Sequence, residues 1–179
     1  DGASLDLYDD PNRNEAAIAD FAGAIAARQF RAFSARAKTL FEAFDAPVMT
    51  APTPSLLPLG GHVMAKPWLI PKMAPLSTLA QMLDRAFDDP RLAQLFGRYA
   101  TYVGGSPYAS PGLLSLIWHA EERGVWVVDG GMHQLAVALS TLAEARGAEF
   151  SFGCHVSELM PQNGNATGVK LEDGSILPA

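Results

Sequence analysis

The longest patterned stretch of the chain runs from residue 14 to residue 44 and repeats apolar side chains every three or four positions. That spacing matches the turn of an α-helix and places the apolar residues on one face. The stretch therefore predicts one long amphipathic helix, or two helices with a break near Gly23. The face that must be buried consists of Ile18, Phe21, Ile25, Phe30, Phe33, Ala37, Leu40, Phe41 and Phe44.

A proline-rich segment follows, between residues 47 and 75. Proline has no N–H donor and biases the preceding residue away from the α conformation, so we expect a loop or a set of short turns here. The segment is also too apolar for a solvated linker, so it either folds over the core or touches lipid or an apolar ligand. Its large apolar residues are Leu56, Leu57, Leu59, Val63, Met64, Trp68, Leu69, Ile70 and Met73.

Further helices are predicted downstream of this segment. Asp89 is suited to cap a helix that has Pro90 at its first position, and Gly124 is suited to end another. The predicted helices span 77–87, 90–102, 112–123 and 130–145.

Strands are predicted mainly in the last third of the chain. Asp173-Gly174 between two apolar runs is typical of a β-hairpin. The predicted strands span 4–8, 125–128, 149–152, 155–160, 167–172 and 175–177. This order predicts a mixed α+β class: a mostly helical domain over residues 1–124, which includes the strand at 4–8, and a segment over 125–179 with a strand, a helix and a β-meander. Because the strands at both ends lack partners, we expect an internal fragment of a longer protein.

Composition and motifs exclude several classes of function. The net charge of -6, from 13 Lys+Arg and 19 Asp+Glu without a basic run, argues against nucleic-acid binding. One cysteine cannot form an intrachain disulfide, and the four histidines are too far apart in sequence to suggest a metal site. Neither a phosphate-binding glycine motif nor a nucleophile elbow is present. No acid–base set is evident, so no catalytic residue is assigned. No apolar run is long enough to span a bilayer, so only peripheral membrane contact is expected.

Two Gly-Gly pairs, at residues 104–105 and 130–131, flank an aromatic segment with two of the three tryptophans. Glycine allows positive φ and lets another group approach the backbone closely. The pairs therefore indicate either a large group lying against this backbone or only the ends and starts of helices.

This segment carries a family resemblance. LFGRYATYVGGSPYASPGLLSLIWHAEERGVWVVDGGM, from residue 95, closely resembles the middle of the bacterial carotenoid desaturases of the phytoene desaturase family. The similarity is greatest to the hydroxyneurosporene and methoxyneurosporene desaturases of purple bacteria. It continues into LDLYDDPNRNEAAIADFAG before this segment and VSELMPQNGNATGVKLEDGSILPA after it. The resemblance thus covers nearly the whole chain.

The resemblance implies an FAD-dependent oxidoreductase that removes two hydrogens from an acyclic carotenoid such as 1-hydroxyneurosporene or methoxyneurosporene. It also implies a helix-rich substrate domain joined to part of an FAD-binding, amine-oxidase-like domain, ending in a β-meander. Backbone groups of Val156, with His155 beside it, are expected at the adenine end of FAD. Gly130 and Gly131 are expected near the flavin ring or the substrate end of the tunnel.

Residues 98, 99 and 102 are a separate hypothesis, because the resemblance does not assign them. We expect Arg98, Tyr99 and Tyr102 to lie against the substrate.

The resemblance implies a cytoplasmic protein with peripheral membrane contact and does not indicate the electron acceptor. Because this chain lacks the dinucleotide motif, we expect it to be inactive alone and to bind FAD weakly or not at all. Two alternatives stay open. One is a non-enzymatic lipid- or carotenoid-binding module. The other is a different amine-oxidase-like flavoenzyme, which would need polar groups to hold an amine or a carboxylate.

Overall fold

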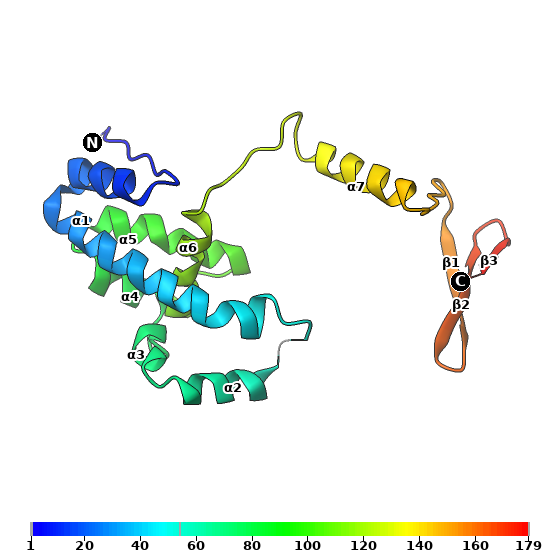
Figure 1. The fold of residues 1–179 in the computed structure, drawn as a ribbon, viewed down its shortest axis with the longest axis horizontal. Coiled ribbons are helices and arrows are strands. Elements are labelled where there is room, and N and C mark those ends of the chain that lie inside the picture. The colour runs from blue at the N-terminus through cyan, green and yellow to red at the C-terminus, as the bar shows by residue number, and fades with distance from the viewer. Residues whose placement is uncertain (1, 54, 179) are drawn as a thin grey trace. The chain divides into compact units, whose positions relative to one another are not determined.

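The computed structural model describes residues 2–53 and 55–178, coloured along the chain in Figure 1. Asp1, Pro54 and Ala179 lie outside the described residues. Pro54 belongs to the expected proline-rich segment, and the two terminal residues belong to the first and second expected domains. Contacts divide the chain into a first unit that ends at Trp126 and a second that starts at Val127. The first unit is helical and the second holds a small antiparallel sheet, so the mixed α+β class is confirmed.

Helix α1, Pro11–Phe44, is the predicted long amphipathic helix. Asp10 caps its start by accepting hydrogen bonds from the backbone N–H groups of Asn12 and Arg13. The predicted break is present, because Gly23 has φ 91° and interrupts the helical backbone. Beyond Phe44 the chain continues as one short π-helical turn, η1, Asp45–Met49.

The core of the first unit is an aromatic cluster around Phe96 on α5, Pro90–Gly97. The ring centroid of Phe96 lies 4.7 Å from that of Phe33 and 6.0 Å from that of Phe30, both on α1. Phe87 and Trp118 approach the same ring, at 5.3 and 5.4 Å. Such aromatic pairs add specific ring contacts to the area that they bury. Phe30 and Phe33 of the predicted apolar face are therefore core, whereas Ile25 of that face is 58% exposed and Phe41 is only partly buried.

Short helices complete the first unit. They are α4, Leu79–Ala86; the 3₁₀ helices η2, Arg98–Val103, and η3, Gly112–Leu116; and α6, Ile117–Glu121. Thr78 and Gln81 form a capping box at the start of α4. The three helices predicted for this region are present. The predicted helices at 90–102 and 112–123 each have one part in the tighter 3₁₀ winding, η2 and η3, so their α-helical parts are shorter than predicted.

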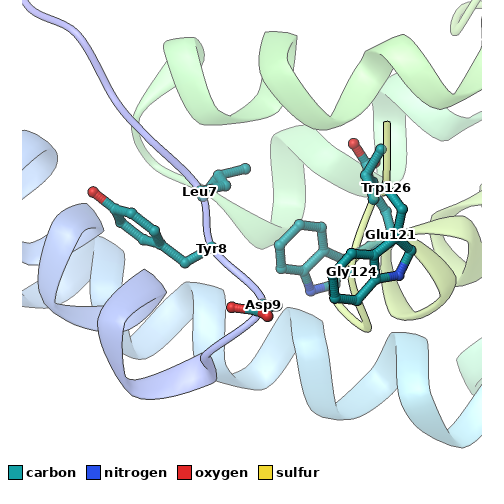
Figure 2. A pocket seen from close by; sticks show the side chains of 8 residues that line it. Leu7, Tyr8, Asp9, Glu121, Gly124 and Trp126 are labelled. Atoms are coloured by element: carbon teal, nitrogen blue, oxygen red, sulfur yellow. The ribbon is translucent and has the colours of Figure 1, made fainter. Parts of the chain in front are cut away.

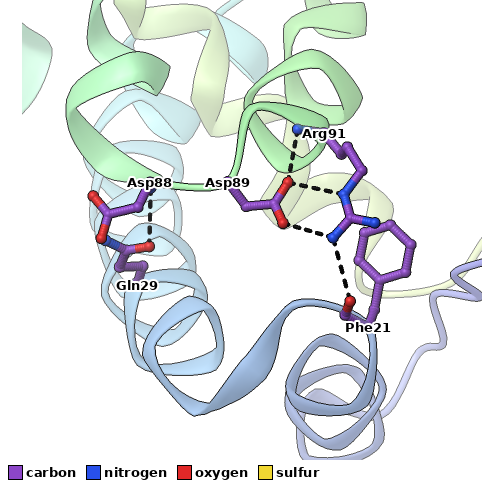
Figure 3. A network of polar contacts seen from close by, with 5 residues as sticks. All are labelled: Phe21, Gln29, Asp88, Asp89 and Arg91. Carbon is purple, nitrogen blue, oxygen red and sulfur yellow. Dashed lines mark hydrogen bonds and ion pairs between the residues drawn. The ribbon is translucent and has the colours of Figure 1, made fainter. Parts of the chain in front are cut away.

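A polar network joins the start of α5 to both halves of α1 (Figure 3). Asp89 caps α5 as predicted and also binds the guanidinium of Arg91, with Oδ2 2.7 Å from Nη2. That ion pair lowers the pKa of the Asp89 carboxyl. Arg91 Nη2 also donates to the carbonyl oxygen of Phe21, before the break at Gly23, at 3.4 Å. After the break, Gln29 Oε1 accepts from the backbone N–H of Asp88 at 3.1 Å.

The proline-rich segment contains helices, so the expectation of only a loop or short turns is wrong. Helix α2 spans Leu56–Ala65 and helix α3 spans Leu69–Met73. Pro58 and Pro71 each occupy the third position of their helix, where no intrahelical partner for an N–H exists. Leu69 is fully buried in a second small core with Leu40, Ala43 and Phe44.

The second unit consists of α7, His133–Ala145, and a three-stranded antiparallel meander. Strand β1, Val156–Gln162, pairs with β2, Asn165–Leu171, which pairs with β3, Ile176–Pro178. Asp173 accepts a hydrogen bond from the backbone N–H of Ser175 in the turn between β2 and β3. The predicted hairpin and meander are therefore confirmed.

Three predicted strands, at 4–8, 125–128 and 149–152, are not formed within the described residues. A strand requires a ladder of hydrogen bonds to a neighbour, and none of the described residues pairs with these segments. The first segment is instead held by the fully buried Asn14. Its Oδ1 accepts from the backbone N–H of Tyr8 at 2.6 Å, and its Nδ2 donates to the Tyr8 carbonyl at 2.8 Å.

Replacing Phe96 with alanine tests the dependence of the first unit on this aromatic cluster. Phe96→Ala should lower the free energy of unfolding by about 3–5 kcal/mol, because it leaves a cavity between α1 and α6. Urea unfolding followed by tryptophan fluorescence measures the change. The matched control is Tyr108→Ala, whose ring is exposed and whose loss should change stability by less than about 0.5 kcal/mol. Equal effects of the two substitutions would contradict a core built around Phe96.

Candidate functional site

A pocket of about 280 Å³ lies in the first unit, between the segment that leads into α1 and the segment that leaves α6. Leu7, Tyr8 and Asp9 line one side, and Glu121, Gly124 and Trp126 line the other (Figure 2). Trp118 completes the wall and donates its indole N–H to Ser34 Oγ at 2.7 Å. The pocket thus lies directly beside the aromatic core.

Gly124 allows the indole of Trp126 to lie against the backbone. Its φ is +114°, which side-chain-bearing residues rarely adopt, and a Cβ at this position would lie 3.0 Å from the Trp126 ring. Glu121 is the last residue of α6, and its carbonyl oxygen accepts a hydrogen bond from the Gly124 N–H. Local backbone geometry therefore places the tryptophan at the pocket.

Arg98, Tyr99 and Glu121 form a polar cluster beside this pocket. Arg98 Nη2 lies 2.5 Å from Glu121 Oε1, and the Arg98 guanidinium carbon lies 5.1 Å from the centroid of the Tyr99 ring. Glu121 Oε2 and the Tyr99 hydroxyl are buried and lie close enough to interact with each other, but neither makes a hydrogen bond of good geometry. Burial, together with the neighbouring Glu121 carboxylate, raises the pKa of the Tyr99 phenol.

Unpartnered buried oxygens of this kind are unusual. Each costs about 1–3 kcal/mol relative to a hydrogen-bonded state. Native proteins contain few of them, and those present call for a specific explanation, such as a functional role. The cluster is therefore a candidate site on physical grounds, because two such atoms belong to neighbouring side chains and one of these side chains lines a pocket.

The hypothesis for residues 98, 99 and 102 can be compared with this geometry. Arg98 and Tyr99 are brought together, and the ring of Tyr102 lies 6.1 Å from that of Tyr99. Tyr99 is fully buried, whereas Tyr102 is 66% exposed. Contact of these three residues with a substrate remains a prediction.

A second cavity, of about 220 Å³, lies where η1, α2, α3 and η3 meet the end of α1. Its walls are entirely apolar. They consist of Phe41, Phe44, Val48, Met49, Leu59, Met73, Leu113 and Leu116. A space lined only by hydrocarbon and thioether groups can hold an apolar chain but cannot orient a polar molecule.

The residues expected near a cofactor lie in the second unit and are exposed. Gly130 and Gly131 have φ +75° and +89°, and nothing lies within 4 Å of a Cβ placed on Gly131. Val156 pairs with Leu171, and the His155 carbonyl accepts from the Glu172 N–H at 2.9 Å. Because β1 is an edge strand within the described sheet, its other edge presents backbone donors and acceptors. The four positions are therefore compatible with a bound planar cofactor, and their contact with one remains a prediction.

Residues 2–53 and 55–178 contain neither a metal-ion cluster nor a membrane-spanning helix. Within these ranges, no three His, Cys, Asp or Glu side chains are grouped so that they could hold a metal ion. In the same part of the chain, no helix combines the length and apolar character needed to cross a membrane.

Sequence reasoning missed Glu121 and the apolar cavity. The partners Arg98 and Glu121 are 23 positions apart, and no local pattern pairs them. The cavity combines residues from 41 to 116, although the density of apolar residues in the proline-rich segment was a usable signal for part of its wall.

Comparison with known proteins supplies the family context. The family model described as flavin containing amine oxidoreductase matches residues 66–179. The hydroxyneurosporene desaturase of Cereibacter sphaeroides is 49% identical over 179 residues, which are 100% of this chain and 36% of the relative. Its counterpart in Rhodobacter capsulatus is 46% identical over 178 residues, 99% of this chain and 36% of the relative. The protein of the same name in Rubrivivax gelatinosus is 39% identical over 176 residues, 98% of this chain and 34% of the relative. The chain thus spans about a third of the length of these relatives.

The buried phenol of Tyr99 predicts a specific dependence of stability on alkaline pH. Its pKa is raised in the folded chain, so the folded state keeps a proton that the unfolded state releases above about pH 10. The stability that Tyr99 contributes is therefore present below that pH and lost as pH rises further. Tyr99→Phe should reduce the fall in unfolding free energy between about pH 9 and 11. At pH 7 it should change the unfolding free energy by no more than about 1 kcal/mol, because it removes both the cost of burying the hydroxyl and its contact with Glu121.

Urea unfolding at a series of pH values measures both effects. Tyr102→Phe is the matched control, because this exposed phenol should leave the alkaline slope unchanged. An unchanged slope in Tyr99→Phe would contradict the assigned environment of the phenol.

Proposed function

Because this chain belongs to the family of flavin-containing amine oxidoreductases, we propose that it forms the substrate-binding part of an FAD-dependent carotenoid desaturase. The observation that carries the proposal is the similarity to hydroxyneurosporene desaturases along the full 179 residues. The first unit is the proposed substrate domain and the second is part of the proposed FAD-binding domain. The proposed boundary between the two domains falls between residues 124 and 125, close to the end of the first compact unit at Trp126.

The proposed substrate is an acyclic carotenoid, such as 1-hydroxyneurosporene or methoxyneurosporene. The apolar cavity supports this class, because its walls offer no polar group to an amine or a carboxylate. Burial of hydrocarbon against such walls contributes about 25 cal/mol for each Å² removed from water. The same feature disfavours an amino-acid or polyamine oxidase.

Residues of the polar cluster, with Tyr102 beside it, are also proposed to contact the substrate. The exposed ring of Tyr102 and the guanidinium of Arg98 can reach a ligand. The buried ring of Tyr99 packs against both side chains and helps to position them. Glu121 fixes the Arg98 side chain through their ion pair.

The proposed cofactor is FAD, which when bound accepts the two electrons released as a carbon–carbon single bond becomes a double bond. Backbone groups on the outer edge of β1, at His155 and Val156, are proposed to hold its adenine end. Gly130 and Gly131 would allow close approach to the backbone, because neither carries a Cβ and the space beside Gly131 is open.

Peripheral contact with a membrane is part of the proposal, because a carotenoid partitions into lipid. In the first unit, residues 49–76 expose large apolar side chains: Met49, Leu57, Met64, Trp68, Ile70 and Leu76. Lys66 and Lys72 lie in the same stretch, and Lys72 Nζ is 5.9 Å from the Trp68 ring centroid. Apolar and basic side chains together are typical of a surface that binds anionic lipid. We propose a cytoplasmic protein that touches the membrane here.

A chimera tests the proposed activity directly. These 179 residues would replace the matched segment of the Cereibacter sphaeroides relative, which supplies the rest of a flavoprotein. The chimera should bind FAD and convert 1-hydroxyneurosporene, with a red shift of its absorbance as the polyene lengthens. The unmodified relative is the positive control. A chimera that holds FAD but gives no red shift would contradict the desaturase proposal, and carotenoid binding without turnover would favour a non-enzymatic module.

Sedimentation of the same chimera with vesicles tests the membrane surface. A Trp68→Ser, Leu76→Ser double variant should bind phosphatidylglycerol-containing vesicles at least tenfold more weakly, a difference of about 1.4 kcal/mol. The control is Tyr108→Ser, an exposed aromatic residue outside residues 49–76. Equal loss in both variants, or loss in neither, would refute the assignment of the surface.

A further inference from the structure

Positive charge is segregated onto one part of the first unit. The whole chain has 19 Asp+Glu against 13 Lys+Arg, yet residues 21–41 and 46–83 contain no Asp or Glu. These ranges include much of α1 and all of α2 and α3. Arg31 and Lys38 of α1 pair with carboxylates outside the two ranges. Within the described residues, no carboxylate lies at ion-pair distance from Arg36 or Lys72.

The side chains of Arg36, on α1, and Lys72, on α3, meet where the two helices pack. Arg36 Nε donates to the carbonyl oxygen of Lys72 at 2.8 Å. Lys72 Nζ in turn donates to Thr39 Oγ1 at 3.4 Å. Because Thr39 follows Arg36 by three positions on α1, the two residues share a face of that helix. The guanidinium and the ammonium group therefore lie on the same face of α1, together with the Thr39 hydroxyl.

The Arg36 guanidinium has unused hydrogen-bond donors. Its Nη2 atom is shielded from solvent and has no hydrogen-bond partner. Its Nη1 atom is not shielded, and no described residue accepts a hydrogen bond from it. Partial burial lowers the pKa of the guanidinium, although arginine stays charged at any physiological pH. A second cation nearby adds repulsion, so an anion that contacts both groups would stabilise this junction.

Exposed apolar side chains adjoin the two cations. Lys72 Nζ lies 5.9 Å from the ring centroid of Trp68, which is 53% exposed. Ile70 and Leu76, on either side of Lys72 in the sequence, are also exposed. In a phospholipid the phosphate lies next to the acyl chains, so a protein surface that binds it places cations beside apolar groups. A free phosphate ion would gain nothing from these apolar neighbours, so the arrangement favours a lipid.

We propose that Arg36 and Lys72, together with the Thr39 hydroxyl, bind the phosphodiester group of an anionic phospholipid. This inference rests on the membrane contact in the proposed function and assigns a headgroup site to it. Arg36 Nη1 and Lys72 Nζ donate to the phosphate oxygens in charge-assisted hydrogen bonds. Met73, the residue after Lys72, lines the apolar cavity. The site therefore places lipid beside one wall of the cavity that is proposed to take a carotenoid.

Sedimentation of the flavin-loaded chimera with two kinds of vesicle tests the site. One kind contains phosphatidylglycerol and phosphatidylcholine, and the other contains phosphatidylcholine alone. A basic residue at an anionic membrane surface strengthens binding about fivefold. Lys72→Gln should therefore weaken binding to the phosphatidylglycerol vesicles about fivefold, and the Arg36→Gln, Lys72→Gln double variant about 25-fold. Binding to phosphatidylcholine alone should change less than about twofold, because that surface carries no net charge.

Arg28→Gln is the matched control, because it removes the same charge from an exposed position of α1. Arg28 lies about 12 Å from Arg36 along the helix, so its loss should weaken vesicle binding less than about twofold. Arg36→Lys keeps the charge and should retain most of the binding that Arg36→Gln loses. Thermal unfolding of each variant separates lipid binding from folding. Lys72→Gln alone decides the outcome if Arg36→Gln does not fold.

The outcomes separate this inference from the rest of the proposed function. Selective loss of phosphatidylglycerol binding supports the site even if the chimera never converts a carotenoid, a result that would refute only the desaturase proposal. Equal effects of Arg28→Gln and Lys72→Gln, or no effect of the double variant, would refute the site and leave the membrane contact standing. A parent chimera that binds neither kind of vesicle would refute the contact and the site together.

Inorganic phosphate distinguishes a lipid headgroup from a free anion. Thermal unfolding of the parent chimera and of the double variant is measured with inorganic phosphate and with chloride at equal ionic strength. Phosphate should not stabilise the parent more than the double variant. Selective stabilisation of the parent, with vesicle binding unchanged in the double variant, would assign the site to a free anion and overturn the lipid proposal.

Discussion

The packing of Phe96 against the phenylalanine face of α1 is the contact on which the first unit depends. It joins the longest helix to α5, and Trp118 extends the same cluster to α6. Arg98 and Tyr99 follow α5 directly, and Glu121 ends α6. The core therefore sets the distance between the members of the polar cluster. A site residue in this protein is positioned by aromatic stacking two or three residues away, and its own hydrogen bonds are secondary.

The buried polar side chains differ in whether they have hydrogen-bond partners. Asn14 is fully buried, yet it exchanges two hydrogen bonds with Tyr8, so its burial stabilises the structure. His62, Tyr99 and Glu121 keep buried atoms without partners and so weaken it. Glu121 lines a pocket, Tyr99 lies beside Glu121, and the His62 ring lies near that of Phe44. Each of these atoms lowers stability relative to a hydrogen-bonded state.

Much of the fold follows from local pattern. The period of residues 14–44, the cap at Asp89-Pro90 and the turn at Asp173-Gly174 predicted real elements, because each depends on neighbours in sequence. The strands predicted at 4–8 and 125–128 are not formed among the described residues, because a local pattern does not show whether a pairing partner is present. Helix α2 was missed because the prolines of this segment were expected to exclude helices, whereas a proline in the first turn does not disrupt one. The ion pair of Arg98 with Glu121, and the position of His62 beside Phe44, depend on tertiary packing that no local signal encodes.

The break at Gly23 gives the Asp89–Arg91 network a further role. Across that break the two halves of α1 do not share a continuous ladder of backbone hydrogen bonds, and the network holds Phe21 on one side and Gln29 on the other. Tertiary hydrogen bonds to the start of α5 thus hold both halves of α1 on either side of the break. The first half carries Asn14, which holds Tyr8 at the rim of the pocket. The Asp89–Arg91 pair at the start of α5 is therefore connected, through the first half of α1, to a residue that lines the pocket.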